Sequence, residues 1–212
     1  MRMRNKWVLL VVAGWFAAIG LSGGPYQRDA PPAWDCPPEG RGGDPALNRQ
    51  KNREVAPKKY RPVDLPSLLA ELPIGLPTLG PRADYPDAVT AQLARWESQG
   101  VALEGYVIGF KREGPESPNC LSKIYRDHHI WIGAHPGAPK SDCLVVEITP
   151  RTETAALLRT LAVVKKQRQK VIVKGWLMYD PHHAAEVGRS RASDWEVHPV
   201  FTIAPVTKSR VR

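Results

Sequence analysis

Alternation of hydrophobic and polar positions marks the second half of the chain as a series of β-strands. Residues 170–179 alternate cleanly, with Val171, Val173 and Leu177 on one side, and a period of two is typical of a half-buried strand. Further β-rich stretches are separated by turn residues. The predicted strands are residues 101–110, 127–134, 143–149, 170–179 and 195–203.

A helix is predicted between the third and fourth of these strands. Leu157, Leu161 and Val164 fall on one helical face, and Thr152 is the expected N-cap. The last turn is rich in lysine and arginine, which suit the negative end of the helix dipole.

The order of three strands, one helix and two strands is that of the OB fold. A ferredoxin-like or split βαβ arrangement needs a helix after the first strand, and residues 112–126 are too rich in glycine and proline to favour one. We therefore predict an all-β fold with added helices, a five-stranded OB-type barrel (β-β-β-α-β-β) over residues 101–206.

A docking element is predicted before the barrel, in residues 66–100. Leucines in residues 66–81 predict a short helix and an irregular strap. Val89, Leu93 and Trp96 then follow at helical spacing, with Asp87 as the expected N-cap and Gly100 as the residue just after the helix. We expect this amphipathic helix to pack against one open end of the barrel.

The N-terminus has the three-part pattern of a secretory signal over residues 1–24. A basic start is followed by an apolar run, residues 7–21, and then by small residues. The run is shorter than the roughly 20 residues of a spanning helix, so we prefer a cleaved signal to a signal-anchor. Export to the periplasm or the extracellular space follows, with a signal-anchored membrane form as the alternative.

Residues 25–65 are rich in proline and glycine and are predicted to form a flexible linker. A short basic island without proline, residues 47–53, interrupts it. This island is either a binding motif or a solvated helical turn, and we prefer the second. The chain ends in a basic tail, residues 207–212. Its formal net charge of +9 favours anionic partners or serves solubility alone.

Three cysteines in an exported chain favour a disulfide. Cys120 and Cys143 both lie in the predicted barrel, so we expect them to pair and Cys36 to be left over. A metal site made of the three is less favoured, because none has the C-x-x-C spacing of a zinc site.

Motifs of nucleophilic catalysis and phosphate binding are absent from the sequence. It has no G-x-S-x-G elbow and no G-x-x-x-x-G-K-[ST] loop. The triplet at residues 127–129 is shared with DHH phosphoesterases, but the parallel sheet and further aspartate motifs of those enzymes are missing. An HNH nuclease unit is excluded because residues 131–133 continue as a strand. We predict no catalytic residues and no cofactor.

All six histidines lie in the predicted barrel. Most are expected on the surface or in hydrogen bonds, because their spacing matches no zinc signature. An alternative interpretation joins Asp127, His182 and His198 in a metal site. With such a site, the protein would be a metal-dependent nuclease or phosphodiesterase on an OB barrel.

Binding is the favoured class of function. OB barrels bind extended polymers over their second and third strands and the neighbouring loops, and single-stranded nucleic acid needs aromatic stacking in a basic groove. The candidate ligand-binding residues are Tyr125, Arg126, Trp131, Arg189 and Arg191.

Two segments resemble a group of uncharacterised exported bacterial proteins. They are GWLMYDPHH at residues 175–183 and DWEVHPV at residues 194–200, together with the Leu-Asn-x-x-Lys-Asn-Arg wording of the island at residues 47–53. The resemblance implies secretion, a bacterial source and a C-terminal barrel of the OB type, but no activity. The W-E-x-H-P wording at residues 195–199 is similar to a structural signature in which His198 hydrogen-bonds across the barrel, and contact with a ligand is the alternative role of His198.

The sequence as a whole predicts an exported binding module of the cell envelope or extracellular space. Its expected ligand is an anionic polymer, nucleic acid or acidic glycan, or else a protein partner from the envelope. A scaffold role in an envelope complex is a further alternative. The membrane is expected to matter only transiently, through the signal segment.

Overall fold

The computed structural model describes residues 34–206, so the predicted signal segment and basic tail lie outside the described residues. Its α-helices are α1 (Pro45–Lys51), α2 (Leu65–Glu71), α3 (Asp87–Glu97) and α4 (Ala155–Gln167). Its strands are β1 (Arg61–Asp64), β2 (Gly100–Arg112), β3 (His128–Gly133), β4 (Leu144–Ile148), β5 (Lys170–Tyr179) and β6 (Trp195–Pro205). Four 3₁₀ helices connect them: η1 (Arg82–Asp84), η2 (Ser117–Asn119), η3 (Lys140–Asp142) and η4 (Pro181–Glu186).

The predicted OB-type barrel is confirmed. The strand order is β1-β2-β3-β4-β6-β5, and a further pairing of β2 with β5 closes the last five strands into a barrel. Strands β4 and β6 run parallel, whereas the other pairs of the barrel are antiparallel. Gly105 permits the crossing of β2 over β3, because a Cβ atom there would lie 2.5 Å from Cγ2 of Ile132.

Helix α4 lies between β4 and β5 in the chain and packs on the barrel through Leu157, Leu161 and Val164, as predicted. Its N-cap is Thr154, whose hydroxyl accepts a hydrogen bond from the Leu157 amide at 3.1 Å. The predicted cap, Thr152, instead bonds to Thr149 in the turn after β4. Capping residues two positions apart cannot be distinguished by periodicity alone.

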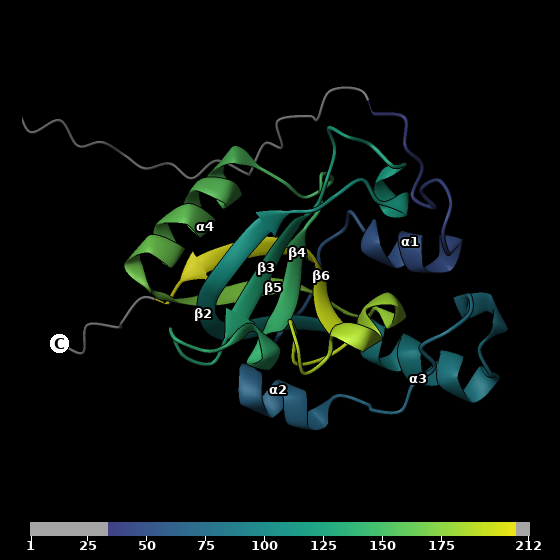
Figure 1. Ribbon diagram of the computed structural model, residues 1–212, viewed down its shortest axis with the longest axis horizontal. Coiled ribbons are helices and arrows are strands. Elements are labelled where there is room, and N and C mark those ends of the chain that lie inside the picture. The colour runs from purple at the N-terminus through teal and green to yellow at the C-terminus, as the bar shows by residue number, and fades with distance from the viewer. Residues whose placement is uncertain (1–33, 207–212) are drawn as a thin grey trace, which may run out of the picture.

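Helix α3 lies at the opposite end of the barrel from α4 (Figure 1). It packs on the core through Leu93, and its Trp96 ring lies 6.0 Å from that of Trp195. Asp87 is the first helical residue rather than the N-cap. Gly100 opens strand β2 instead of ending the helix, and a Cβ there would lie 2.3 Å from Cβ of Pro57.

The structure differs from the predicted flexible linker in residues 34–65. This segment contains α1, and it contains β1, which adds a parallel strand to the start of β2. The basic island is not solvated: Leu47, Asn48, Lys51 and Asn52 are buried. Figure 1 shows α1 against the side of the barrel. The prediction failed because a high content of proline and glycine indicates an irregular backbone, which can be either flexible or packed against a distant part of the protein.

The predicted disulfide is wrong. Cys120 pairs with Cys36 across 84 positions, and Cys143 is free and buried. Cys143 directly precedes β4, and its thiol faces the Pro139 carbonyl at 3.2 Å. A disulfide indicates a non-reducing compartment. Within residues 34–206, no helix combines the length and apolarity that a membrane span requires.

Candidate functional site

Strands β3, β4 and β6 present an apolar face to the barrel interior and a charged face to the outside. The inward residues Ile130, Val146 and Val197 belong to the main core. Because side chains alternate along a strand, the residues between them point outward. Those polar outward residues are His129, Glu147, Glu196 and His198, and with Asp127 at the end of the first barrel loop they form what we call the charged cluster.

This outer face is the one that OB barrels use for ligands, since β3 and β4 are the second and third barrel strands. Here the chain itself covers it. The cover consists of the first barrel loop (residues 113–127), the last barrel loop (residues 180–194) and residues 34–56, which we call the cover segment. Each residue of the charged cluster is at most 3% exposed.

The cover segment is fastened at many points. The disulfide joins it to the first barrel loop. The Asn52 amide donates to the carbonyl of Pro118 at 2.8 Å, and the Asn48 side-chain oxygen accepts a hydrogen bond from the Ser117 hydroxyl at 3.1 Å. The Arg53 guanidinium donates to backbone carbonyls, including that of His198 at 3.2 Å. The basic island and Cys36 therefore both hold the cover segment to the barrel.

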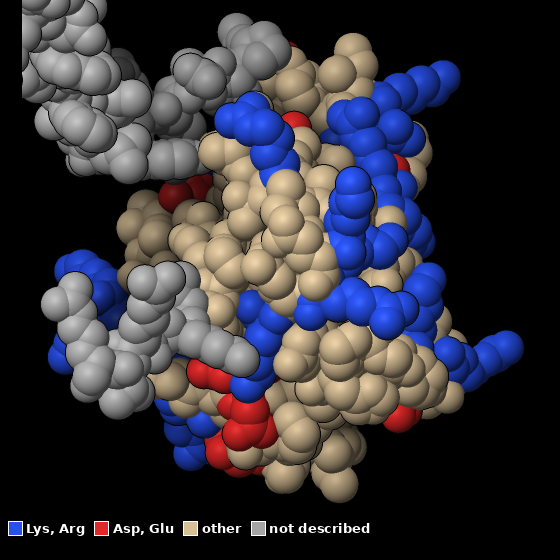
Figure 2. Space-filling view, turned by 90° about the vertical axis from the view of Figure 1, so that its left-hand side faces the viewer, with Lys and Arg blue, Asp and Glu red and all other residues tan. Residues whose placement is uncertain are grey.

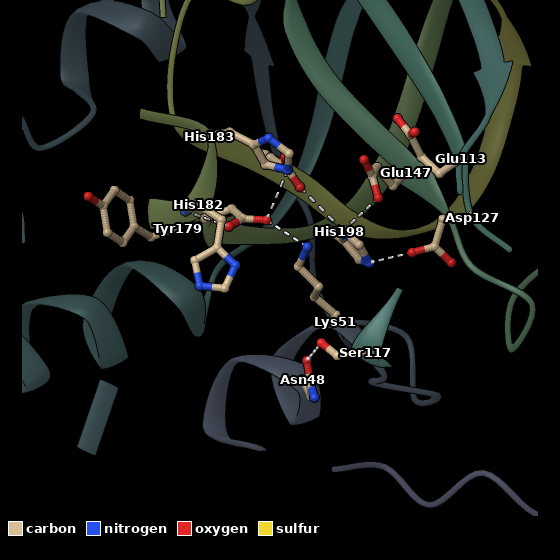
Figure 3. Close-up of polar contacts among 12 residues, drawn as sticks. Asn48, Lys51, Glu113, Ser117, Asp127, Glu147, Tyr179, His182, His183 and His198 are labelled. Carbon is tan, nitrogen blue, oxygen red and sulfur yellow. Dashed lines mark hydrogen bonds and ion pairs between the residues drawn. The ribbon is translucent and has the colours of Figure 1, made fainter. Parts of the chain in front are cut away.

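His198 lies at the centre of the charged cluster. Its Nδ1 atom is 3.3 Å from an oxygen of Glu196 and 3.3 Å from an oxygen of Glu147, while its Nε2 atom is 3.8 Å from Oδ2 of Asp127. Figure 3 shows Glu147 and Asp127 at different edges of the ring, the first toward Nδ1 and the second toward Nε2. Burial would lower the pKa of His198, but the hydrogen bond to Glu196 and the nearby carboxylates outweigh it and raise the pKa.

Two buried cations balance part of this negative charge. The Arg191 guanidinium pairs with Glu196 at 2.6 Å, and the Lys51 ammonium pairs with Asp180 at 2.6 Å. Burial would raise the pKa of Glu196, but the charge of Arg191 outweighs it and holds the pKa well below its usual value. The two pairs connect the last barrel loop to β6 and to α1.

His129 connects the cluster to the first barrel loop. Its Nδ1 atom lies 2.8 Å from Glu113 and 3.1 Å from Glu147. Burial would lower the pKa of His129, but hydrogen bonds to these two carboxylates raise it to about 9. The pKa of Asp127 is also raised, to about 6, but there burial itself is the main cause because it disfavours the charged carboxylate.

Three sets of potential metal ligands occur among the described residues, and they share members or lie side by side. They are Glu113, His129 and Glu147; Asp127, Glu147 and His198; and Asp180, His183 and Glu196. Within each set the ligand atoms lie within 4.8 Å of one another. Imidazole with carboxylate suits zinc, iron or manganese.

The structure brings together two of the three residues of the alternative metal site, and metal binding itself stays a prediction. Asp127 and His198 come together, but His182 belongs to none of these sets. It is exposed, and Figure 3 shows its ring apart from His198. Neighbouring residues in a loop need not share a direction, so the sequence could not choose between His182 and His183.

The predicted ligand-binding residues do not line one open groove. Tyr125 stacks on Trp34, with ring centroids 4.8 Å apart, and Trp131 is 6% exposed beneath the Lys140 ammonium. Arg191 is buried in its pair with Glu196. Arg126 is half-buried and Arg189 is exposed.

Sequence reasoning missed most of the charged cluster. Its missed members and direct partners are Lys51, Glu113, His129, Glu147, Asp180, His183 and Glu196. One signal was available: Glu147 is the single charged residue in an otherwise apolar strand, Leu144–Ile148, and a lone carboxylate there must be paired or bound.

A second feature is exposed rather than enclosed. Between Glu153 and Asp180 the chain has no acidic residue. Arg159, Lys165, Lys166 and Arg168 of α4 and its C-cap are exposed, and none forms an ion pair within residues 34–206; we call them the basic face. Figure 2 faces the side on which α4 lies and shows Lys and Arg side chains in a band along it.

Fold and site together define a five-stranded OB-type barrel. The outer face of β3 and β4, which OB barrels in general use for ligands, is covered here by the cover segment and two barrel loops and carries buried charged residues. No protein-family model matches the chain, and no curated protein does. The resemblance to exported bacterial proteins thus stays a prediction.

Among solved structures, the chain is similar to one described as "OBody AM2EP06 bound to hen egg-white lysozyme", at 14% identity and a TM-score of 0.36, over 57% of this chain and 92% of that one. At that score we derive neither fold nor function from the similarity.

Proposed function

We propose that this protein is an exported binding module that holds an acidic glycan through the basic face of α4. The observation that carries the proposal is the set of exposed cations, Arg159, Lys165, Lys166 and Arg168, that have no acidic partner within residues 34–206. Uncompensated charge of one sign on one face attracts polymers of the opposite sign.

The location differs from the usual ligand face of an OB barrel. A polymer on β3 and β4 would have to displace the cover segment, which a disulfide and several hydrogen bonds hold in place. The basic face needs no such displacement. Export is supported by the same disulfide, which indicates a non-reducing compartment.

An acidic glycan is favoured over single-stranded nucleic acid. Nucleic-acid binding without sequence preference depends on bases stacking on exposed aromatic rings. The two aromatic residues predicted for this role are occupied, because Tyr125 stacks on Trp34 and Trp131 is buried. At the basic face itself, the Phe110 ring already has the Lys165 ammonium 5.1 Å from its centroid. A glycan carrying carboxylate or sulfate groups needs charge and hydrogen bonds only.

Hydrolysis of a phosphodiester is less well supported than binding. The charged cluster has the residue types for metal-assisted hydrolysis, but His198 and Glu196 are 0% exposed. A polymer substrate cannot reach groups enclosed to that degree without movement of the cover segment.

The test compares two double variants with the same change in charge. Binding of heparin, and of an oligothymidylate, is measured by fluorescence anisotropy over a series of salt concentrations. K165E/K166E alters the basic face, whereas K58E/K59E alters two exposed lysines in the loop before β1. We expect K165E/K166E to weaken heparin binding at least about tenfold and K58E/K59E to weaken it by less than about threefold, because direct contacts of the polymer with the basic face are lost only in the first variant.

Three results would contradict this proposal. If heparin does not bind even at low salt, the proposal that the ligand is an acidic glycan is wrong. Equal losses in the two variants assign the effect to net charge rather than to the basic face. Tighter binding of the oligothymidylate than of heparin assigns the surface to nucleic acid instead.

A further inference from the structure

Each of three side chains in the charged cluster has one buried polar atom without a hydrogen-bond partner. These atoms are Oδ2 of Asp127, Oε2 of Glu147 and Nε2 of His198. The three side chains are between 0% and 3% exposed. An unpaired polar atom is costly to bury, and native structures contain few of them. Three such atoms whose side chains converge on one space indicate a missing partner.

We propose that Asp127, Glu147 and His198 bind a divalent transition-metal ion, Zn²⁺ in preference to Mn²⁺. The ligand atoms that the three residues can offer lie within 4.8 Å of one another. One imidazole and two carboxylates are three ligands of the kind that zinc accepts in open protein sites, where water completes the coordination. The site goes beyond the proposed binding of a glycan and does not depend on it.

The second atom of each proposed ligand is held in place by a neighbour. Asn119 donates its amide to Oδ1 of Asp127 at 2.9 Å, and His129 contacts Oε1 of Glu147 at 3.1 Å. In both carboxylates the oxygen left over is the unpaired one. Outer contacts of this kind orient the ligands of metal sites.

The ring of His198 is oriented in the same manner. Its Nδ1 atom lies 3.3 Å from Oε2 of Glu196, and the other oxygen of Glu196 accepts from Arg191 at 2.6 Å. A histidine that ligates metal through one nitrogen commonly donates the other N–H to a carboxylate. Glu196 and Arg191 are therefore positioning residues, and Nε2 is the nitrogen that faces Asp127 at 3.8 Å.

Ion pairing within the cluster does not remove the need for a cation. Lys51 is close, but its ammonium is engaged by Asp180 at 2.6 Å. The Nδ1 atom of His198 lies 3.3 Å from Oε2 of Glu147, yet this contact lacks hydrogen-bond geometry and leaves that oxygen unpaired. The first barrel loop adds two more buried acceptor atoms without partners, Oε2 of Glu116 and Oδ1 of Asn119.

The donor set selects the metal. Calcium requires six to eight oxygen ligands, and magnesium prefers several waters in octahedral geometry. An imidazole nitrogen with two carboxylates is better suited to zinc, and to manganese at lower affinity according to the general order of transition-metal affinities. Cys143 is not part of the set, since it lies with Trp131 in a separate apolar cluster.

The experiment measures zinc binding to the folded protein after removal of metal by a chelator. Isothermal titration with ZnCl₂, MnCl₂ and CaCl₂ gives affinities, and elemental analysis gives the zinc content. We expect one Zn²⁺ per chain, weaker Mn²⁺ and no Ca²⁺. Glu147→Gln and His198→Gln should each lower zinc affinity by more than about 100-fold, beyond the 10–100-fold cost of losing an outer contact.

His182→Gln is the matched control, because it removes an imidazole from the sequence-predicted site but not from this one. It should leave zinc affinity within about twofold, since its ring contacts none of the proposed ligands. If His198→Gln does not fold, Asp127→Asn provides the same test while retaining the shape of the side chain and its contact with Asn119.

Absence of zinc binding in the parent protein overturns the proposal, and the charged cluster is then an ion network complete in itself. Unchanged affinity in both Glu147→Gln and His198→Gln also overturns it. An equal loss in His182→Gln moves the site to the last barrel loop. None of these outcomes affects heparin binding to α4, so the two proposals fail independently.

Discussion

The two faces of strands β3, β4 and β6 are built on opposite principles. Toward the barrel interior, Ile132, Val146 and Val197 form part of a continuous apolar core. Toward the outside, one to three residues away in the same strands, His129, Glu147 and Glu196 are buried to a similar degree but are charged. The inner face of these strands is therefore stabilised by close packing of apolar side chains. The outer face is stable only if each buried polar atom has a hydrogen-bond or ion-pair partner.

The comparison explains why the outer face requires so much additional structure. Apolar side chains are stabilised wherever water is excluded. Buried charges are tolerated only with partners at short distance, and here those partners come from α1, from both barrel loops and from the disulfide-linked cover segment. Variants that act on one face alone test this difference.

The largest expected effect comes from the disulfide, which belongs to the outer face only. Cys36→Ser should lower the free energy of unfolding by about 4–5 kcal/mol, the chain-entropy estimate for a closed loop of that length. Urea denaturation with and without reductant measures it. Cys143→Ala is the control and should keep the full sensitivity to reductant. If the urea midpoint of the parent protein does not change when reductant is added, the cover segment is held in place without the disulfide.

Breaking one buried ion pair should cost nearly as much. Arg191→Met leaves Glu196 charged and unpaired, and should lower the free energy of unfolding by about 3–5 kcal/mol. The double variant R191M/E196L removes both charges and should recover at least about 2 kcal/mol of that loss. Both are measured by urea denaturation with a chelator present. A double variant as unstable as the single one would mean that Glu196 is needed for more than its pair with Arg191.

Substituting two adjacent valines, one on each face of β4, compares the stability contributions of the two faces directly. Val146 and Val145 are both 0% exposed, the first in the main core and the second in the small cluster around Trp131. Val146→Ala should cost about 2–3 kcal/mol, because the closed barrel cannot relax into the cavity, and Val145→Ala about 1 kcal/mol less. Thermal and urea unfolding give both values. Equal costs would mean that the turn over Trp131 is as rigid as the barrel.

The smallest effect is expected where an arginine pair is open to water. Arg61 and Glu71 lie 2.9 Å apart, with side chains 35% and 49% exposed. Arg61→Ala should change the free energy of unfolding by less than about 1 kcal/mol. The contrast with Arg191→Met in the same assay isolates the effect of burial on otherwise similar ion pairs. A loss close to that of Arg191→Met would assign Arg61 a role in holding β1 against β2.

Prediction from the sequence succeeded where the signal is local. The alternation of residues 170–179 and the helical spacing of Leu157, Leu161 and Val164 reflect geometry that repeats every two or 3.6 residues. The barrel strands and α4 could therefore be located, and their order favoured the OB fold. The positions of caps and helix ends were off by one or two residues, as with Thr152 and Thr154.

Prediction failed where distant segments meet. The sequence placed Asp127 and His198 in one candidate site, but it added His182 and omitted Glu147, because nothing local records that β4 and β6 lie side by side and parallel. The same limit applies to the pairing of Cys36 with Cys120.

The sequence by itself determined that the last half of the chain forms strands with one apolar face, because the alternation of hydrophobic and polar residues is a local property of each segment. Only the tertiary structure decided what covers the other face. Residues 47–53 read as a solvated basic turn, yet the fold places Lys51 and Arg53 against the barrel. The physical reason is that charged residues in a segment tolerate either water or buried partners, and the partners here lie up to 145 positions away in the chain.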